Sequence, residues 1–350
     1  MTSVSSRPIA RLSSPGDIVA TIPTLCGFLP QDSLVVLSLR GPRRRLGLTV
    51  RLDLPPRSAE GEAAELLAER VAHDGAAAVA AVTFGTTRRP ELIEALTASC
   101  ELRGLSVAEA LHVDDGRWTS YACCRPCCPS TGTPVPAAPS LVEAQGTFGG
   151  RAVLGSREEL VRSLAAPILL QAQAAGQALD TASEQWLRQR AADGLQAART
   201  NDVQRARAAL DIVAHGGSLD LATAAHLAVA LHDVLVRDQI ATWALKRSDA
   251  LLSMAEQVVR LTGPPYDAPA CTLLAWVSYA RGDGSRANVA LDRALMTDPA
   301  YSLALLLREA LDGAVPPREV RKVLKGTRAA LRAGEPQGAR PCVPELNSPG

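Results

Sequence analysis

Hydrophobic and polar residues alternate with two different periods along the first third of the chain. Runs with period two are typical of strands, whereas apolar residues three and four apart, closed by a glycine, are typical of helices. The predicted strands are 33–39, 46–54, 77–84, 106–113 and 117–121, and the predicted helices between them are 59–73 and 90–102. Because strand–helix–strand segments form parallel crossovers, we expect residues 1–150 to form an α/β domain with a mixed sheet: an antiparallel hairpin, two crossovers and a final hairpin.

The pattern after this domain is almost wholly helical. The Pro-rich segment 129–140 reads as a connection, and Ser156 followed by Glu159 is a capping box that predicts a helix start. The helices predicted beyond it are 183–196, 203–214, 221–235, 248–261, a pair within 268–301, 301–311 and 318–333. We therefore expect an α+β protein whose second part, residues 151–333, is an all-α domain, followed by a disordered tail at 334–350.

Residues 268–301 form the most distinctive unit of the helical part: a helix, a Gly-Asp-Gly turn, a second helix and a proline stop. Small and apolar residues match the spacing of a tetratricopeptide repeat, but the aromatic residues of that repeat are missing. The positions in register are Cys271, Leu274, Ala275, Ala287, Leu291 and Pro299. The spacing predicts a tetratricopeptide-like helical hairpin, set either in a repeat array or in a plain bundle. Such a hairpin needs neighbouring helices and often borders a groove for another protein.

Several longer segments carry a family resemblance. They are SPGDIVATIPTLCGFLPQDSLVVLSLRG, LTVRLDLP, YACCRPCCPSTGTP, LHDVLVRD and LLAWVSYARGDGSRANVALDRALMTDPAYSLALLL. Together they resemble a family of actinobacterial proteins described as a domain of unknown function, number 4192, over nearly the whole chain. The resemblance implies an ordinary bacterial cytoplasmic protein, and it transfers no activity, cofactor or catalytic residue.

Charge and composition narrow the classes of partner. The chain has 37 basic and 36 acidic side chains, so its overall charge favours neither nucleic acid nor an acidic membrane. Locally the charges separate, since residues 313–350 hold seven bases against three acids. No apolar run approaches the ~20 residues that span a bilayer, and the first residues lack a signal peptide core. We expect a cytoplasmic protein without a membrane partner, whose eight cysteines are mostly thiols.

A cluster of cysteines is the most chemically suggestive motif. Its members are Cys123, Cys124, Cys127 and Cys128. Cys124 and Cys127 have the spacing of half a zinc site, but a closed site needs four ligands and no second pair follows at similar spacing. Cys100 or His112 could complete a zinc site. The other interpretations are a redox pair and a small-residue turn that packs sulfur against the sheet. We expect no cofactor, and zinc is the alternative.

Motifs of common enzymes are absent from the sequence. No H-E-x-x-H, P-loop, G-x-S-x-G or G-x-G-x-x-G pattern follows the expected elements. Asp233 and Arg237, four residues apart, instead predict a helical ion pair. In an α/β domain a ligand crevice lies at the carboxyl ends of the parallel strands. That placement makes Asp53, Gly85, Thr86, Thr87 and Asp114 the candidates for a ligand crevice.

Two basic segments are candidates for phosphate contact. One is the hairpin tip with Arg40, and the other is one face of the last helix. The contact candidates are Arg43, Arg44, Arg45, Arg321, Lys325, Arg328 and Arg332. A solvated loop and a capping helix are the plainer interpretation of the same residues.

These observations favour a non-enzymatic cytoplasmic interaction or scaffold protein, with an unknown protein partner held against the helical domain. One alternative is an enzyme or small-ligand-binding protein that uses the α/β crevice. A second alternative is a nucleic-acid-associated protein that uses the basic segments.

Overall fold

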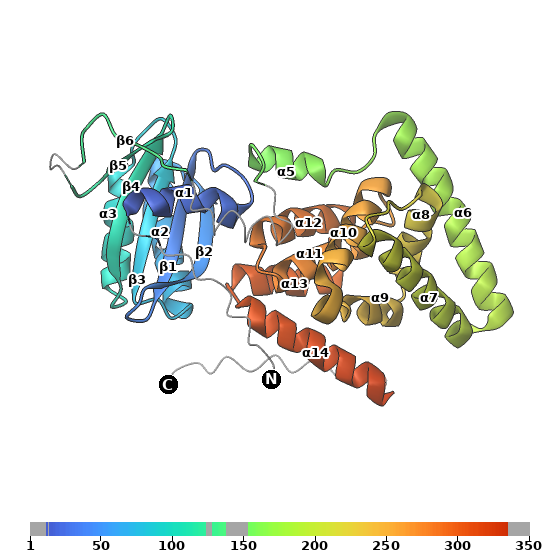
Figure 1. Cartoon of the computed structure of the whole chain (residues 1–350). Helices are drawn as coiled ribbons and strands as arrows, with labels where there is room; N and C mark the ends of the chain where they lie inside the picture. The colour runs from blue at the N-terminus through green and yellow to red at the C-terminus, as the bar shows by residue number, and fades with distance from the viewer. Residues whose placement is uncertain (1–11, 13, 124–127, 138–152, 335–350) are drawn as a thin grey trace, which may run out of the picture. The chain divides into compact units, whose positions relative to one another are not determined.

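The computed structural model describes residues 12, 14–123, 128–137 and 153–334 (Figure 1). The chain divides into two compact units. Unit 1 comprises the described residues of 1–162 and 312–316, and unit 2 those of 163–311 and 317–350. The predicted disordered tail lies almost wholly outside the described residues. Among the described helices, none combines the length and the apolar character that crossing a bilayer requires.

Unit 1 is built on a six-stranded mixed sheet with the order β2-β1-β3-β4-β5-β6. The strands are β1 (Ser33–Arg40), β2 (Arg45–Asp53), β3 (Ala78–Phe84), β4 (Ser106–Asp114), β5 (Arg117–Ser120) and β6 (Thr133–Pro134). Strands β3 and β4 are parallel, and every other neighbouring pair is antiparallel. Since β1 lies between β2 and β3, the first crossover passes over one strand. The predicted mixed sheet, with its hairpins and two crossovers, is confirmed.

Helices cover both faces of the sheet. They are α1 (Pro15–Cys26), α2 (Glu60–His73) and α3 (Pro90–Glu101). A short 3-10 helix at Arg57–Ala59 precedes α2, and α5 (Arg157–Ser163) follows the sheet in sequence. Leu34 and Val79 of the sheet pack with Leu67 of α2 and Leu96 of α3 in one buried cluster. Helix α1 lies on the opposite face of the sheet (Figure 1). Because successive strand residues point to opposite faces, the alternate strand residues are on the α1 side. This two-sided cover explains why β1 and β3 are apolar along almost their whole length.

The Pro-rich segment after β5 departs from the expectation of a plain connection. Thr133 and Pro134 pair with Trp118 and Arg117 and form the short edge strand β6. Proline cannot donate a backbone hydrogen bond, which confines it to sheet edges. The short, proline-bearing strand therefore closes one side of the sheet against further pairing.

Unit 2 is all-helical, as predicted. Its helices are α6 (Leu169–Asp193), α7 (Leu195–Ala214), α8 (Leu221–Ala230), α9 (Val234–Ala241), α10 (Ala244–Leu261), α11 (Ala268–Ala280), α12 (Gly284–Thr297), α13 (Ser302–Asp312) and α14 (Pro317–Ala333). Helix α6 begins well before the predicted start at residue 183 and is exposed along most of its length. Its polar sequence lacks a wide apolar stripe, which is why periodicity underestimated its length.

The predicted helical hairpin corresponds to α11 and α12. All thirteen residues of α11 are buried, because α9, α10, α12 and α14 pack around it. The Tyr279 hydroxyl donates a 2.8 Å hydrogen bond to the Ala310 carbonyl of α13. Since α11 has no exposed face, a protein partner would have to contact other helices of unit 2.

Helix α8 ends at Ala230 and Asp233 caps the start of α9, so the predicted helix 221–235 is wrong. The Asp233 side chain accepts the Leu235 N–H at 3.1 Å and caps α9. A capping aspartate adopts extended backbone and interrupts the helix before it. The predicted ion pair with Arg237 is wrong for the same reason: Arg237 instead donates to Asp238 (2.7 Å) and to the Tyr301 hydroxyl (2.7 Å).

Candidate functional site

An open pocket of about 310 Å³ lies in unit 1, where β2 and β3 end. It is lined by Asp32, Leu54, Arg57, Thr86, Thr87 and Arg89. Two of the predicted crevice residues, Thr86 and Thr87, therefore line a pocket at the expected edge of the sheet. Asp53 and Asp114 do not line it; the side chain of Asp53 is 78 % exposed and pairs with Arg51 at 2.6 Å.

The backbone at the pocket floor depends on Gly85. Its φ is +139°, and a Cβ at this position would lie 2.7 Å from Oδ1 of Asp32. Asp32 itself has a φ of +41°, and its carbonyl accepts the Leu54 N–H at 2.8 Å. The absence of a side chain at Gly85 therefore lets the Asp32 carboxylate approach the β3–α3 loop.

Arg89 holds one wall of the pocket. Its Nε donates to Oε1 of Glu60 at 2.6 Å, and its NH2 donates to the Pro55 carbonyl at 2.6 Å. The side chains of this ion pair are only 12 % and 7 % exposed. Arg89 thereby ties together the loop after β2, the start of α2 and the start of α3.

A chain of hydrogen bonds runs behind the pocket. The Arg89 N–H donates to the Tyr121 hydroxyl at 2.9 Å, which lies 2.8 Å from the Thr83 hydroxyl. Thr83 is in turn 3.0 Å from Nδ1 of His112, its register partner on β4. Burial and the nearby Arg88 guanidinium lower the pKa of His112, which favours the neutral ring. A neutral ring with Nδ1 unprotonated accepts the Thr83 proton, so every donor in this chain has an acceptor.

Arg88 and Arg57, the other two arginines near the pocket, differ in how readily a ligand could bind to them. Arg88 lies with its guanidinium 4.4 Å from the centre of the Tyr121 ring and donates to Thr119 and to the Ser120 carbonyl. Arg57 is 63 % exposed and pairs at 3.2 Å with Glu91, which is 61 % exposed. Exposed pairs of this kind contribute little to stability. Arg57 is therefore the lining cation that a ligand could recruit most easily.

The lining groups are suited to binding polar molecules. The Arg57 guanidinium and two threonine hydroxyls supply donors, and the Asp32 carboxylate supplies an acceptor. In the described part of the chain, the hydroxyls of Thr86 and Thr87 form no hydrogen bond with protein. Three of the lining residues, Asp32, Arg57 and Arg89, are not predicted by the rule for parallel strand ends. Asp32 could have been predicted from the sequence, because it directly precedes β1. Since β1 is antiparallel to β2 and β3, its start lies at the same edge of the sheet as the ends of those two strands.

In a comparison with known families, residues 15–318 match the family described as "Domain of unknown function (DUF4192)". The chain belongs to the DUF4192 family. The match spans both the mixed-sheet part and most of the helical part. Comparison with curated proteins and with solved structures gives no match.

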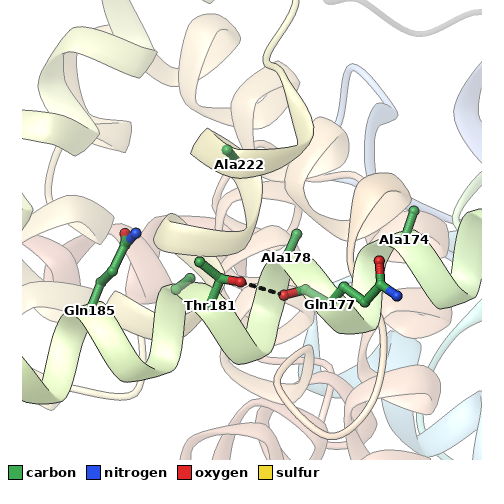
Figure 2. A pocket seen from close by; sticks show the side chains of 7 residues that line it. Ala174, Gln177, Ala178, Thr181, Gln185 and Ala222 are labelled. Carbon is green, nitrogen blue, oxygen red and sulfur yellow. Dashed lines mark hydrogen bonds between the residues drawn. The ribbon is translucent and has the colours of Figure 1, made fainter.

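A second open pocket of this DUF4192 protein lies in unit 2 between α6 and α8 (Figure 2). Its volume is about 320 Å³. It is lined by Ala174, Gln177, Ala178, Thr181, Ala182, Gln185 and Ala222. The Thr181 hydroxyl donates to the Gln177 carbonyl at 2.9 Å, which leaves small apolar groups and amides facing the groove. None of these lining residues titrates near neutral pH, so the groove is suited to packing rather than acid–base chemistry.

Only two of the four clustered cysteines lie within the described residues. Cys124 and Cys127 lie outside the described residues, and Cys123 and Cys128 are half-buried. Cys100 packs in the core of unit 1, where burial raises the pKa of its thiol to about 11. Within the ranges that the structure describes, no three potential metal ligands lie together. The zinc site remains a prediction from sequence.

The basic contact candidates lie on two separate elements. Arg43, Arg44 and Arg45 are exposed at the turn between β1 and β2. On α14, Arg321, Lys325 and Arg332 are exposed and Arg328 is half-buried. Neither group touches a described pocket.

A buried network of charges in unit 2 was not predicted. Asp202 is fully buried, with Oδ2 3.1 Å from Arg190 NH1 and Oδ1 3.1 Å from His226 Nε2. Asp233 accepts from Arg199 at 2.8 Å and from Arg190 at 3.2 Å. Burial raises the pKa of Asp233, but the hydrogen bonds from Arg199 and Arg190 outweigh this effect and lower it. The network joins α6, α7, α8 and the start of α9, which is a structural role.

Proposed function

We propose that this DUF4192 protein binds a small polar ligand with an anionic group in the pocket at the carboxyl ends of β2 and β3. The observation that carries the proposal is the position of Arg57 beside two threonine hydroxyls that make no hydrogen bond with described protein. Guanidinium and hydroxyl donors at one pocket match the acceptor oxygens of a carboxylate or a phosphate.

The pocket also favours a second polar group on the ligand. The Asp32 carboxylate lines the same pocket as Arg57. A purely anionic ligand would be repelled by Asp32, whereas a ligand with hydroxyl or amino donors would hydrogen-bond to it. The matching chemistry is an anionic group at one end and hydroxyl or ammonium groups at the other, as in a sugar phosphate or an amino acid.

Glu91 and an anionic ligand would compete for Arg57. In the structure the Glu91 carboxylate, at the first turn of α3, is the partner of Arg57. An anionic ligand would take over this position, where helix α3 presents its positive end. Replacing Glu91 by glutamine is therefore expected to strengthen ligand binding, whereas loss of Arg57 weakens it.

Isothermal titration of the full chain tests this proposal. A panel of inorganic phosphate, sugar phosphates, nucleoside monophosphates and amino acids is titrated into wild type, Arg57→Ala, Glu91→Gln and the control Arg43→Ala. A hydrogen bond to a charged group contributes about 1.5–3 kcal/mol, so Arg57→Ala should weaken binding roughly 10- to 100-fold. Equal weakening by Arg43→Ala, or no binding of any probe at millimolar concentration, would contradict the proposal.

A protein partner bound by unit 2 is a second candidate function, supported by an apolar surface on α6. Ile168, Leu169 and Leu170 are 70 %, 84 % and 82 % exposed. Contiguous exposed apolar residues of this size mark contact sites more often than isolated ones do. The alanine-lined groove begins at Ala174, one helical turn further along α6. This continuity favours an apolar helix of a partner lying along α6.

Co-purification from a native lysate under matched conditions tests the second candidate. The variant Ile168→Ser/Leu170→Ser should lose a partner that wild type retains, because serine removes the apolar contact area. Leu102 of unit 1 is 86 % exposed, and Leu102→Ser is the matched control. An unchanged partner list in the α6 variant would count against this role.

A further inference from the structure

Helix α14 (Pro317–Ala333) is held to unit 2 by its first half alone. Val320 and Leu324 are its buried residues, and they face α9, α10 and α11. No residue of the described helix beyond Leu324 is buried. The second half of α14 extends away from the neighbouring helices of the unit (Figure 1). The second half of α14 therefore projects from the core of the unit.

The charge of α14 is strongly one-sided. The helix holds six cations and a single acid, Glu319, which pairs with Lys322 and Arg318. Among described residues, no carboxylate pairs with the other four cations. These are Arg321, Lys325, Arg328 and Arg332. We call these four residues the cationic stripe.

The cationic stripe is straight and regular. Its members are four, three and four residues apart, which places them within about 60° of one another around the helix axis. With a rise of about 1.5 Å per residue, the stripe is about 16 Å long. Such a row of unpaired cations on a projecting helix matches a linear polyanion with regularly spaced charges.

We propose that the cationic stripe of α14 binds the phosphate backbone of duplex DNA without reading its sequence. Duplex DNA presents one phosphate per about 3.4 Å of axis on each strand, so several phosphates lie within reach of the stripe. The major groove of B-form DNA admits an α-helix, whereas that of duplex RNA is too narrow. Helix α14 carries no Asn or Gln to read adenine and no aromatic side chain to stack on bases, so we assign its cations to phosphate contacts.

An anionic membrane fits the helix less well. Helices that bind in the membrane interface bury an apolar face in the lipid. In α14 that face is already used, because Val320 and Leu324 pack inside unit 2. Val323, at 48 % exposure, is the one large hydrophobic side chain that the described helix exposes. Lipid binding would thus have to be purely electrostatic.

Fluorescence anisotropy of the full chain with a labelled 20-base-pair duplex tests the proposal. When the logarithm of the binding constant is plotted against the logarithm of the salt concentration, each phosphate contact contributes about −0.9 to the slope. Four contacts give a slope of about −3.6, or a loss of roughly 100-fold between 50 and 200 mM NaCl. The variant Arg321→Ala/Lys325→Ala/Arg332→Ala should bind at least tenfold more weakly at 50 mM, with a slope near −1.

The control removes the same number of charges elsewhere. Arg43→Ala/Arg44→Ala/Arg45→Ala changes the exposed hairpin turn of unit 1 and should bind DNA as wild type does. Alanine is a strong helix former, and the three substituted side chains of α14 are exposed, so circular dichroism should show an unchanged helix content. Equal weakening by the two triple variants would overturn the assignment to α14.

Three further probes test the identity of the polyanion. Polyglutamate, duplex RNA and vesicles with anionic lipid are compared with the DNA duplex at 50 mM NaCl. DNA should bind most tightly. Equal or tighter binding of polyglutamate, RNA or vesicles would overturn the choice of duplex DNA. A lack of DNA binding at 50 mM NaCl would overturn the proposal itself.

Discussion

The Tyr121 hydroxyl lies 2.8 Å from the Thr83 hydroxyl and also accepts the backbone N–H of Arg89 at 2.9 Å. One phenol thus connects the end of β3, the segment after β5 and the start of α3. The position of the Arg89 backbone, and with it the wall of the ligand pocket, depends on an oxygen contributed from 32 residues away.

Replacing Tyr121 by phenylalanine should therefore lower the free energy of unfolding by about 1–2 kcal/mol. The variant keeps the ring but leaves the Arg89 N–H without its acceptor. Urea unfolding followed by circular dichroism measures the loss. Tyr266→Phe is the control, since the Tyr266 hydroxyl has no hydrogen bond to any described residue. Equal stability of the two variants would refute the role of the Tyr121 hydroxyl.

His112 should make stability depend on pH below neutrality. Burial and Arg88 hold its folded-state pKa below the ordinary value of 6.5. The unfolded chain keeps the ordinary pKa of about 6.5. At a pH between the folded-state and the unfolded-state pKa, the unfolded chain binds more protons than the folded chain, so the free energy of unfolding falls as pH drops below about 6.5. Unfolding experiments at pH 7.5, 6.5 and 5.5 measure this loss.

The variant His112→Asn isolates the contribution of this side chain. Asparagine can still accept the Thr83 proton but does not titrate, so the loss of stability between pH 7.5 and 5.5 should become smaller. It should not vanish, because burial also lowers the pKa of His232. An identical pH dependence in wild type and His112→Asn would exclude a depressed pKa at His112.

Gly47 should be intolerant of any side chain. A Cβ there would lie 2.5 Å from Asp74 Oδ2, the oxygen that accepts the Leu48 N–H at 2.9 Å. Gly47→Ala must displace this buried carboxylate and should destabilise the protein by roughly 1–3 kcal/mol. In contrast, a Cβ at Gly61 of α2 meets nothing within 4 Å, so Gly61→Ala should stabilise by about 0.4–1 kcal/mol. Thermal unfolding distinguishes the two; a neutral Gly47→Ala would show that the contact is not tight.

The order of elements was predictable because it depends on local periodicity. Alternation in β1 and β2 and helical spacing in α2 and α3 identified the mixed sheet before any tertiary contact was known. The break at Asp233 was missed, because a capping aspartate between two apolar helices leaves the helical period almost unchanged. Local patterns also missed the length of α6, because its sequence is polar and has no wide apolar stripe.

The pocket was predictable only in part. The rule for parallel strand ends identified Thr86 and Thr87, which follow β3 after Gly85. Arg57 and Arg89 were not identified, since their positions depend on contacts with Glu91 and Glu60 that lie about 30 residues away in sequence. Long-range ion pairs have no period, and a single sequence contains no signal for them.

Asp202 is expected to be the most sensitive acid of unit 2. It is fully buried between Arg190 and His226, so Asp202→Ala leaves a buried guanidinium without one acceptor and should destabilise by about 3–5 kcal/mol. Glu184→Ala removes the exposed partner of Arg188 on α6 and should change stability by less than about 0.5 kcal/mol. Urea unfolding of the two variants gives the comparison. A loss below 1 kcal/mol for Asp202→Ala would mean that water replaces the carboxylate and that the network does not hold α6, α7 and α8 together.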